Sequence, residues 1–326
     1  MRSSSSLVAA LSLCAALAGC GGGGSDGGTP APDITPLGAN ILVFDSDRTG
    51  NHEIYLMRND GSASAQVTSD TSYENWWPRI SPDRRKLLFY RSPRGSSERY
   101  DLASLWVVNV DGSGLTRLRA AGTDGWAVQG HGEWSPDGGS IAMFGGSATS
   151  PQIFITDSLG RFPRQLTARA GVNTDVSWSP DGRTLLFNGC PGTPCTPADY
   201  EIYTMPSAGG AETRLTFDHL ADYDPYFSPD GTKIAWLTNS NPSAWSGAGA
   251  WGISLANADG SNPVWLIDDG NINSKPAWSL DGRSIYFHRM EPLVATKWGV
   301  YSMGADGTGL TALTSGSSAN NEFPSN

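Results

Sequence analysis

The sequence predicts an all-β fold, a six-bladed β-propeller whose blades are four-stranded antiparallel sheets. Three observations predict it: a short motif recurs six times, an apolar segment follows each copy at a fixed distance, and a hairpin turn comes later in each unit. Repeats of about 40 to 50 residues that carry only strand signals are typical of propeller blades.

The recurring motif is Ser-Pro-Asp, which marks the units at intervals of 44 to 54 residues. Its copies, including the variants Thr-Pro-Leu and Ser-Leu-Asp at the two ends, begin at Thr35, Ser81, Ser135, Ser179, Ser228 and Ser279. Self-similarity at a regular period indicates a repeat architecture. The six copies therefore predict six units.

Two strand-like segments follow the motif in each unit. The first begins six residues after the Ser or Thr and covers 41–44, 87–90, 141–144, 185–188, 234–237 and 285–288. The second alternates apolar with polar residues, as half-buried strands do, over 53–57, 104–108, 152–156, 201–205, 252–256 and 299–303. Hairpin turns such as Asp60-Gly61 come next, because Gly accepts a positive φ. With a strand before the motif and one after the turn, each unit has four strands and no room for a helix.

The two ends of the propeller are expected to meet in one blade. The tail Asn321-Glu-Phe-Pro324 aligns with Asn75-Trp-Trp-Pro78, which leads into an innermost strand. We therefore predict that the tail pairs into the blade begun by Ile41. Pro32-Asp33-Ile34 is a competing candidate for the same place. Either strand would remove an open sheet edge.

The first 33 residues predict export and membrane attachment. The apolar run from Leu7 to Leu17 is too short to span a bilayer. The segment Leu17-Ala18-Gly19-Cys20 resembles the lipobox of bacterial lipoproteins, in which the Cys is acylated; a plain signal peptide with an incidental Cys is the alternative. We predict a signal peptide at 1–19, a lipidated Gly-rich tether at 20–33 and the propeller at 34–326. We favour attachment to the outer membrane, with the protein facing the periplasm.

Charge and cysteine content narrow the function classes. The formal charge of -10 is scattered and no basic stripe occurs, which argues against a nucleic-acid partner. Cys190 and Cys195 lie close together in sequence, and outside the cytoplasm such a pair predicts a disulfide that pins one loop. A zinc site is the alternative, but it needs further ligands, and no His lies in that segment.

The pattern Trp-Ser-Pro-Asp-Gly, Ile-x-Phe, Glu-Ile-Tyr, Asp-Gly and Leu-Thr resembles the TolB-like, or WD40-like (PD40), repeats. The resemblance covers the chain from about Asp33 to Asn326. It implies a propeller that acts as a non-catalytic binding or scaffold protein of the bacterial cell envelope, with an envelope protein or peptide as partner. We predict no cofactor. A carbohydrate-binding protein and a channel-mouth lyase or glycosidase are the alternatives, and we expect a monomer.

Strand direction places the long, irregular connections on one face, the long-loop face. Variable loops on a rigid scaffold tend to carry function. This face is also rich in aromatic residues, which suit peptides, proteins or sugar rings: Tyr73, Trp76, Trp77, Tyr100, Trp126, Tyr223, Trp245, Trp251 and Trp298. The alternative is that these side chains pack beneath their own loops.

A polar residue lies six residues before each Ser of the motif, and the tail supplies Asn321 at the matching position; the others are Asn75, Gln129, Asn173, Asp222 and Asn273. These side chains could form a polar ring at the channel mouth. The alternative is that each side chain bonds the backbone of its own turn. Two residues later come His131, Asp175 and Asp224, which could bind a metal, and then Lys275. Because a second His is missing, we predict no metal site, and we predict no catalytic residue. The candidate binding face is Asn75, Trp76, Trp77, Gln129, His131, Asn173, Asp175, Asp222, Asp224, Asn273 and Lys275.

Overall fold

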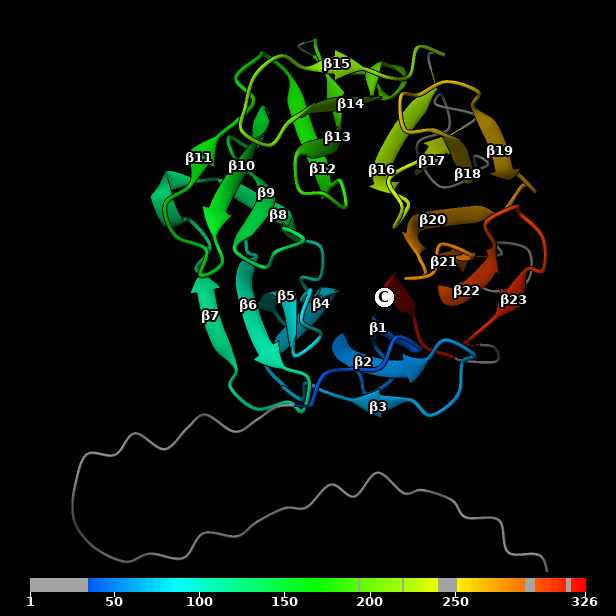
Figure 1. Ribbon diagram of the computed structural model, residues 1–326. Coiled ribbons are helices and arrows are strands. Elements are labelled where there is room, and N and C mark those ends of the chain that lie inside the picture. The colour runs from blue at the N-terminus through cyan, green and yellow to red at the C-terminus, as the bar shows by residue number, and fades with distance from the viewer. Residues whose placement is uncertain (1–34, 193, 219, 240–250, 291–296, 315–317) are drawn as a thin grey trace, which may run out of the picture. The chain divides into compact units, whose positions relative to one another are not determined.

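Antiparallel sheets stand radially around a central axis (Figure 1), in a computed structural model of the protein. The structure describes residues 35–192, 194–218, 220–239, 251–290, 297–314 and 318–326. The predicted signal peptide, Cys20, the tether and Trp245 lie outside the described residues, as does the competing closing segment Pro32-Asp33-Ile34.

Four layers of strands run from the axis outwards. The strands nearest the axis are β4 (Tyr73–Ile80), β8 (Val128–Trp134), β12 (Val172–Trp178), β16 (Ala221–Phe227), β20 (Ile272–Trp278) and β24 (Asn321–Ser325). The second layer contains β1 (Ile41–Ser46), β5 (Lys86–Pro93), β9 (Ser140–Gly146), β13 (Thr184–Cys190), β17 (Lys233–Asn239) and β21 (Ser284–Met290). Every expected first apolar segment lies inside one of these second-layer strands.

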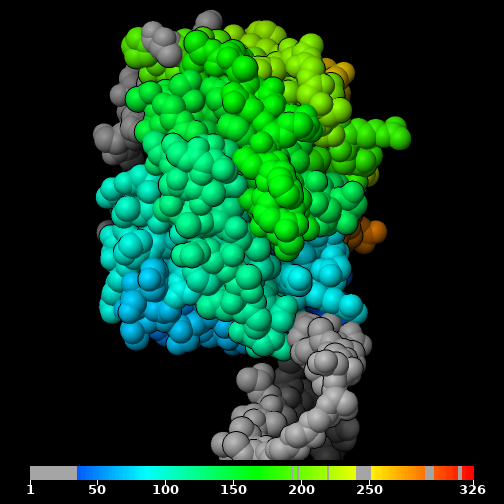
Figure 2. Space-filling view, turned by 90° about the vertical axis from the view of Figure 1, so that its left-hand side faces the viewer, coloured from blue at the N-terminus to red at the C-terminus, as the bar shows by residue number. Residues whose placement is uncertain are grey.

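The outer two layers follow the same order. The third layer contains β2 (Glu53–Arg58), β6 (Ser104–Asn109), β10 (Pro151–Asp157), β14 (Glu201–Pro206), β18 (Trp251–Asn257) and β22 (Gly299–Gly304). The outermost strands are β3 (Ala65–Gln66), β7 (Thr116–Arg119), β11 (Arg164–Gln165), β15 (Thr213–Arg214), β19 (Val264–Ile267) and β23 (Thr311–Ala312). Seen from the side, the segments coloured cyan to green form a continuous outer wall (Figure 2).

The propeller of four-stranded antiparallel blades is confirmed, but the number of separate sheets differs from the predicted six. Four sheets have four strands each, in the orders β24-β1-β2-β3, β4-β5-β6-β7, β8-β9-β10-β11 and β12-β13-β14-β15. The strands from β16 to β23 form one eight-stranded sheet. The physical reason is local: β18 and β20 approach closely enough for one parallel pair, Trp251 with Ile272, which joins the two groups of strands.

The tail closes the ring as predicted. Strand β24 pairs antiparallel with β1, so that Asn321 lies opposite Ser46 and Glu322 opposite Asp45. The inner edge of β1 would otherwise present unpaired backbone groups. Figure 1 shows the end of the chain beside β1, next to the axis.

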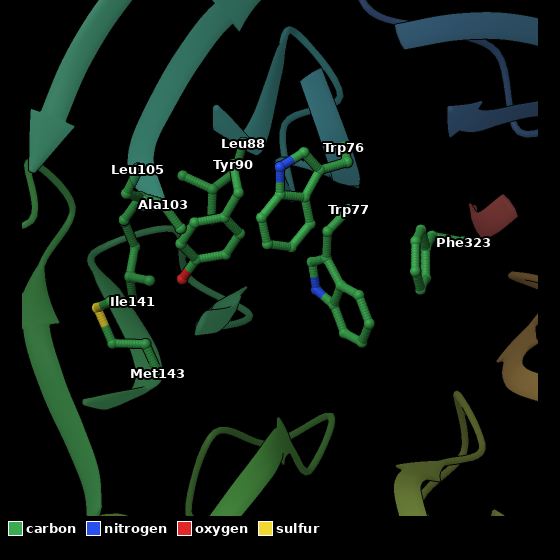
Figure 3. Packing of buried hydrophobic residues seen from close by; sticks show 9 residues of the cluster. All are labelled: Trp76, Trp77, Leu88, Tyr90, Ala103, Leu105, Ile141, Met143 and Phe323. Atoms are coloured by element: carbon green, nitrogen blue, oxygen red, sulfur yellow. The ribbon is translucent and has the colours of Figure 1, made fainter. Parts of the chain in front are cut away.

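The core lies between the faces of successive sheets. One cluster joins Trp76, Tyr90 and Leu105 of the second sheet to Ile141 and Met143 of the next sheet, all of them buried (Figure 3). Each apolar side chain buried in this way contributes about 1.5 to 3 kcal/mol relative to its exposed state. Packing between sheets is therefore what holds the ring together.

The described residues contain two short 3-10 turns, Thr123–Gly125 and Pro197–Asp199, both in long connections. None of the helical segments in the described ranges has the length and apolar character needed to cross a membrane. Beside the second turn, Cys190 and Cys195 form a disulfide with their Cα atoms 6.0 Å apart. That separation lies in the normal range for a disulfide.

The Ser-Pro-Asp motif forms a tight turn between the first two strands of a blade. In the copy at Ser81, the hydroxyl donates to Asp83 at 2.6 Å and accepts from the Lys86 amide at 3.0 Å. The same pair of bonds recurs at Ser135, Ser179, Ser228 and Ser279. These turns share one face of the propeller, opposite the long-loop face, and we call it the turn face.

Candidate functional site

Each strand next to the axis bulges at one residue and places it in the left-handed backbone region. The six residues have φ between 51° and 57° and are Trp77, His131, Asp175, Asp224, Lys275 and Phe323. The pairing register with the neighbouring strand shifts around each of them. Positive φ is uncommon for residues other than Gly, and a bulge redirects a side chain. The strained backbone at these bulges thus directs six side chains toward the axis. We call these six residues the channel ring.

The titratable members of the channel ring are paired with one another. His131 contacts Asp175 through Nδ1, and its Nε2 lies 2.7 Å from the Tyr100 hydroxyl. Lys275 donates to Asp224 at 2.5 Å. Trp77 stacks on the imidazole of His131, with 3.8 Å between ring centroids and 4° between planes.

Burial sets the protonation of these groups. Burial, reinforced by the positive charges of Lys275 and Arg79, lowers the pKa of His131 well below its usual value. Burial also raises the pKa of Tyr100 well above its usual value. The His131 imidazole is therefore neutral, and a neutral imidazole has one donor and one acceptor nitrogen. Burial lowers the pKa of Lys275 as well, against the opposing effect of Asp224.

A second layer of side chains closes the channel beneath the ring. Arg79 contacts Glu133 through Nε and donates from Nη2 to the Tyr226 hydroxyl at 2.8 Å. Tyr226 in turn donates to Glu133 at 2.8 Å. The Arg79 guanidinium lies 4.4 Å from the centroid of Trp77. We call Arg79, Glu133 and Tyr226 the channel plug; they come from β4, β8 and β16.

The charges of the plug are coupled. Burial opposes the charge of Arg79, but Glu133 and Tyr226 outweigh it and raise the pKa of Arg79. Burial raises the pKa of Glu133, and the nearby Arg79 limits that rise. Each group thus depends on the other to remain ionised inside the channel.

A cavity of about 460 Å³ lies at the turn face. Its floor carries the plug and Lys275. Its walls are aromatic residues, prolines of the turns and the last residues of the chain: Trp134, Trp178, Phe227, Trp278, Pro82, Pro136, Pro180, Pro229, Pro324, Ser325 and Asn326. We call this cavity the funnel. It is concave, apolar at the walls and charged at the bottom, as ligand sites commonly are.

The polar positions ahead of the motif do not form an open ring at the channel mouth. Asn75, Gln129, Asn173, Asp222, Asn273 and Asn321 are all buried. Two of them bond to the preceding sheet or the connection from it: Asn75 donates to Glu53 at 2.8 Å, and Gln129 donates to the Ala103 carbonyl at 2.7 Å. The structure assigns them to the junctions between sheets, because a buried amide must find a partner there.

Most of the described aromatic residues predicted for the long-loop face are buried or partly buried. Trp76 and Trp77 are fully buried, and among the described members of that set only Tyr73 is an exposed side chain. Tyr100 packs against Trp76, and Trp126 packs against Phe154. These side chains fill the space between the loops and the sheets beneath them.

Sequence reasoning brought His131, Asp175 and Asp224 together correctly: one ligand atom from each lies within 4.8 Å of the others. It missed the channel plug and the funnel. The signal was present, since Arg79, Glu133 and Tyr226 follow Trp77, His131 and Asp224 by two residues, the spacing of side chains on one face of a strand.

Comparison with known proteins agrees with this architecture. The TolB beta propeller domain matches residues 115–248. The Tol-Pal system protein TolB of Francisella tularensis subsp. tularensis is 26% identical over 263 residues, which cover 77% of this chain. The crystal structure of TolB from Acinetobacter baumannii superposes on 88% of this chain and 66% of its own, with a TM-score of 0.69 and 19% identity. The chain is therefore similar to TolB-like β-propellers, with the match to their propeller domain over residues 115–248.

The extent of the match varies among relatives of this TolB-like chain. An uncharacterized protein of Agrobacterium fabrum, Atu1656, is 33% identical over 169 residues, or 49% of this chain. The chain spans about half the length of the curated relatives it matches, 54% of Atu1656 and 55% of the Francisella TolB. An oligogalacturonate lyase in complex with manganese shares the fold, with a TM-score of 0.53 over 81% of this chain at 14% identity.

Proposed function

We propose that this TolB-like chain is a non-catalytic binding propeller of the bacterial cell envelope, and that a segment of a protein partner docks in the funnel. One observation carries the proposal. The acidic and basic groups of the channel are engaged with one another, whereas the funnel offers aromatic walls around a charged floor. Aromatic anchors of this kind dominate the energetics of protein interfaces.

The pairing of the channel groups supports binding over catalysis. A general base must be able to take a proton from a substrate. Nδ1 of His131 faces Asp175, and Nε2 faces Tyr100. Asp224 is paired with Lys275, whose ammonium supplies the positive charge that a metal ion would otherwise bring. The trio of His131, Asp175 and Asp224 is therefore better explained as part of a rigid channel lining.

The location of the binding site changes from the one predicted from loop length. The long-loop face presents few of its aromatic side chains, so we place the partner on the turn face. We further propose that the eight-stranded sheet serves as two of six blades, since a single residue pair joins its halves. In this proposal residues 34–326 are the propeller, residues 1–19 direct export, and lipid on Cys20 with the tether 20–33 holds the protein at the membrane.

Trp variants test the binding site. A partner is captured from envelope extracts, identified and purified, and its affinity for the protein is then measured by calorimetry. We expect Trp178→Ala and Trp278→Ala each to weaken binding about 30-fold, since an aromatic anchor contributes about 2 kcal/mol. Trp265→Ala, at an exposed Trp on the outer strand β19, is the matched control and should bind normally.

The opposite pattern of binding losses would place the binding site on the long-loop face. If Tyr73→Ala on the long-loop face weakens binding while both funnel variants bind as the wild type does, the partner docks on the long-loop face. The anchor is tested separately: cells supplied with a labelled fatty acid should label the wild-type chain and leave the Cys20→Ser variant unlabelled. Loss of a stoichiometric metal and of an activity on changing His131 to Ala would favour an enzyme instead.

A further inference from the structure

A cluster of two buried carboxylates and one exposed carboxylate lies at the junction between β14 and β16, away from the channel. It contains Glu201, Asp218 and Asp222, and one carboxylate oxygen from each lies within 4.8 Å of the others. Glu201 and Asp222 are almost completely buried, with 1% and 0% of their surface exposed. Like charges this close and this buried are unfavourable unless something positive lies between them.

Two other junctions of the same propeller show what the repeat normally has here. In the first, Asn75 donates its amide to the Glu53 carboxylate at 2.8 Å. In another, Asn173 donates to the Gln152 carbonyl oxygen at 3.1 Å. The Thr of the junction also recurs, because Thr68 and Thr167 donate to Glu53 and Gln152, respectively.

At the junction between β14 and β16, the side-chain amide that donates in the other two junctions is missing. Glu201 takes the place of Glu53, Thr216 takes the place of Thr68, and Asp222 takes the place of Asn75. Thr216 donates its one hydroxyl proton to Glu201 at 2.6 Å. The carboxylate of Asp222 can donate nothing when it is ionised, so the contact that holds the other junctions together becomes a repulsion.

One oxygen of Asp222 is left without a partner. Oδ1 accepts from the Trp236 indole at 2.9 Å and from the Thr238 hydroxyl at 2.8 Å. Oδ2 is buried and has no hydrogen-bond partner among the described residues. A buried, unpartnered carboxylate oxygen within reach of two further carboxylates calls for a ligand.

The neighbouring positive charge does not balance the cluster. Arg214 contacts Glu201 and donates from Nε to the Thr216 carbonyl at 2.6 Å. Arg214 occupies the position that Gln66 has in the first junction, where Gln66 makes the equivalent bond to the Thr68 carbonyl at 2.8 Å. One guanidinium against three carboxylates leaves two formal negative charges, which is the charge of one divalent cation.

We propose that Glu201, Asp218 and Asp222 bind a Ca²⁺ ion that replaces the missing amide and joins the sheet that contains β14 to the sheet that contains β16. The donor atoms are all carboxylate oxygens, the ligands that hard cations prefer, and the loop position of Asp218 allows the flexible geometry that Ca²⁺ accepts. The proposal does not depend on the proposed function, since the cluster lies outside the funnel and the channel ring.

A proton is the competing occupant. Burial, and then the Asp218 carboxylate, raise the pKa of Asp222 to about 8. Without a cation, the folded protein would hold this proton more tightly than the unfolded chain, so stability would fall as the pH rises from about 4 to about 8. Ca²⁺ should therefore bind more tightly at pH 8.5 than at pH 6.

Thermal unfolding of the purified full chain, in EDTA and in Ca²⁺, tests the proposal. With Ca²⁺ at about 100 times Kd, we expect the Tm to rise by about 4 °C. We expect Asp222→Asn, which restores the amide found at Asn75, to abolish this rise and to have a higher Tm in EDTA than the wild type. Glu201→Gln restores an amide from the other side, as Gln152 does, and serves if the first variant fails to fold.

Two further measurements fix the interpretation. Asp259→Asn, in an exposed hairpin turn, is the control variant and should keep the full Ca²⁺ response. Calorimetric titration with CaCl₂ should give one site per chain in the wild type and none in Asp222→Asn. A wild-type Tm that is the same in EDTA and Ca²⁺ at pH 8.5, or an Asp222→Asn variant that keeps the response, would overturn the proposal.

Discussion

The buried pair of Arg79 and Glu133 gives a sharp prediction about the channel plug. Replacing Arg79 with Ala removes the guanidinium from its contact with Glu133, from the Tyr226 hydroxyl and from the face of Trp77. Glu133 keeps one donor, the Tyr226 hydroxyl at 2.8 Å. The variant therefore leaves a buried carboxylate with one hydrogen bond and no counter-charge.

The expected cost follows from that arrangement. Removing one partner of a buried ion pair destabilises a protein by about 3 to 5 kcal/mol, and the remaining Tyr226 bond places this case near 3 kcal/mol. For a chain of this size that corresponds to a fall in Tm of about 5 °C. Replacing Arg79 and Glu133 together with Met should cost about 1 kcal/mol or less, because no charge is then left unpaired.

The loss should also depend on pH. Burial already raises the pKa of Glu133, and loss of Arg79 raises this pKa further. A carboxyl group whose pKa is higher in the folded state is stabilised there by its proton, so the defect should shrink as the pH falls from 8 to 5.

Urea unfolding at the two pH values measures these effects. The control is Arg161→Ala, which breaks an exposed pair with Asp157 and should cost about 0.5 kcal/mol or less. A loss below 1 kcal/mol for Arg79→Ala, or an equal loss at pH 5 and pH 8, would refute the coupling between the two groups.

Two further predictions concern the junctions and the closure of the ring. Asn75→Ala removes the amide that donates to Glu53 and should cost about 1 to 2 kcal/mol in urea unfolding, since a buried acceptor loses a partner; an unchanged midpoint would show that the junction does not need this bond. Removal of residues 321–326 exposes the inner edge of β1 and should produce self-association on size-exclusion chromatography; a monomer with the wild-type Tm would contradict the assigned role of β24.

The strand order could be predicted from the sequence because its signals are local. The offset of six residues after each motif places the apolar segments, and the expected residues 87–90 and 141–144 lie inside β5 and β9. The alignment of the tail with residues 75–78 predicted the pairing of β24. Both signals come from alternation and turn chemistry, which the repeat copies from unit to unit.

The site could not be predicted to the same depth, because it depends on contacts between distant residues. Arg79 and Tyr226 are separated by 147 residues, and although the repeat puts them at the same position of an inner strand, it does not show that their side chains bond to each other. The left-handed residues at the bulges are not Gly, so composition gave no sign of the backbone turn that aims His131 at the axis. Loop length favoured the long-loop face, whereas burial of Trp76 and Trp77 shows that much of its aromatic content fills the interior.

The pairing of β24 with β1 has a consequence for biogenesis. Arg48 and its partner Asn321 are 273 residues apart, so the first sheet waits for its inner strand until nearly the whole propeller has been synthesised. Contacts this distant in sequence make folding slow, and until they form the intermediate exposes an unpaired strand edge that is prone to aggregation. If the chain is exported as proposed, that delay would keep it unfolded during transport and make it a substrate of chaperones that hold unfolded chains until the final strand has arrived.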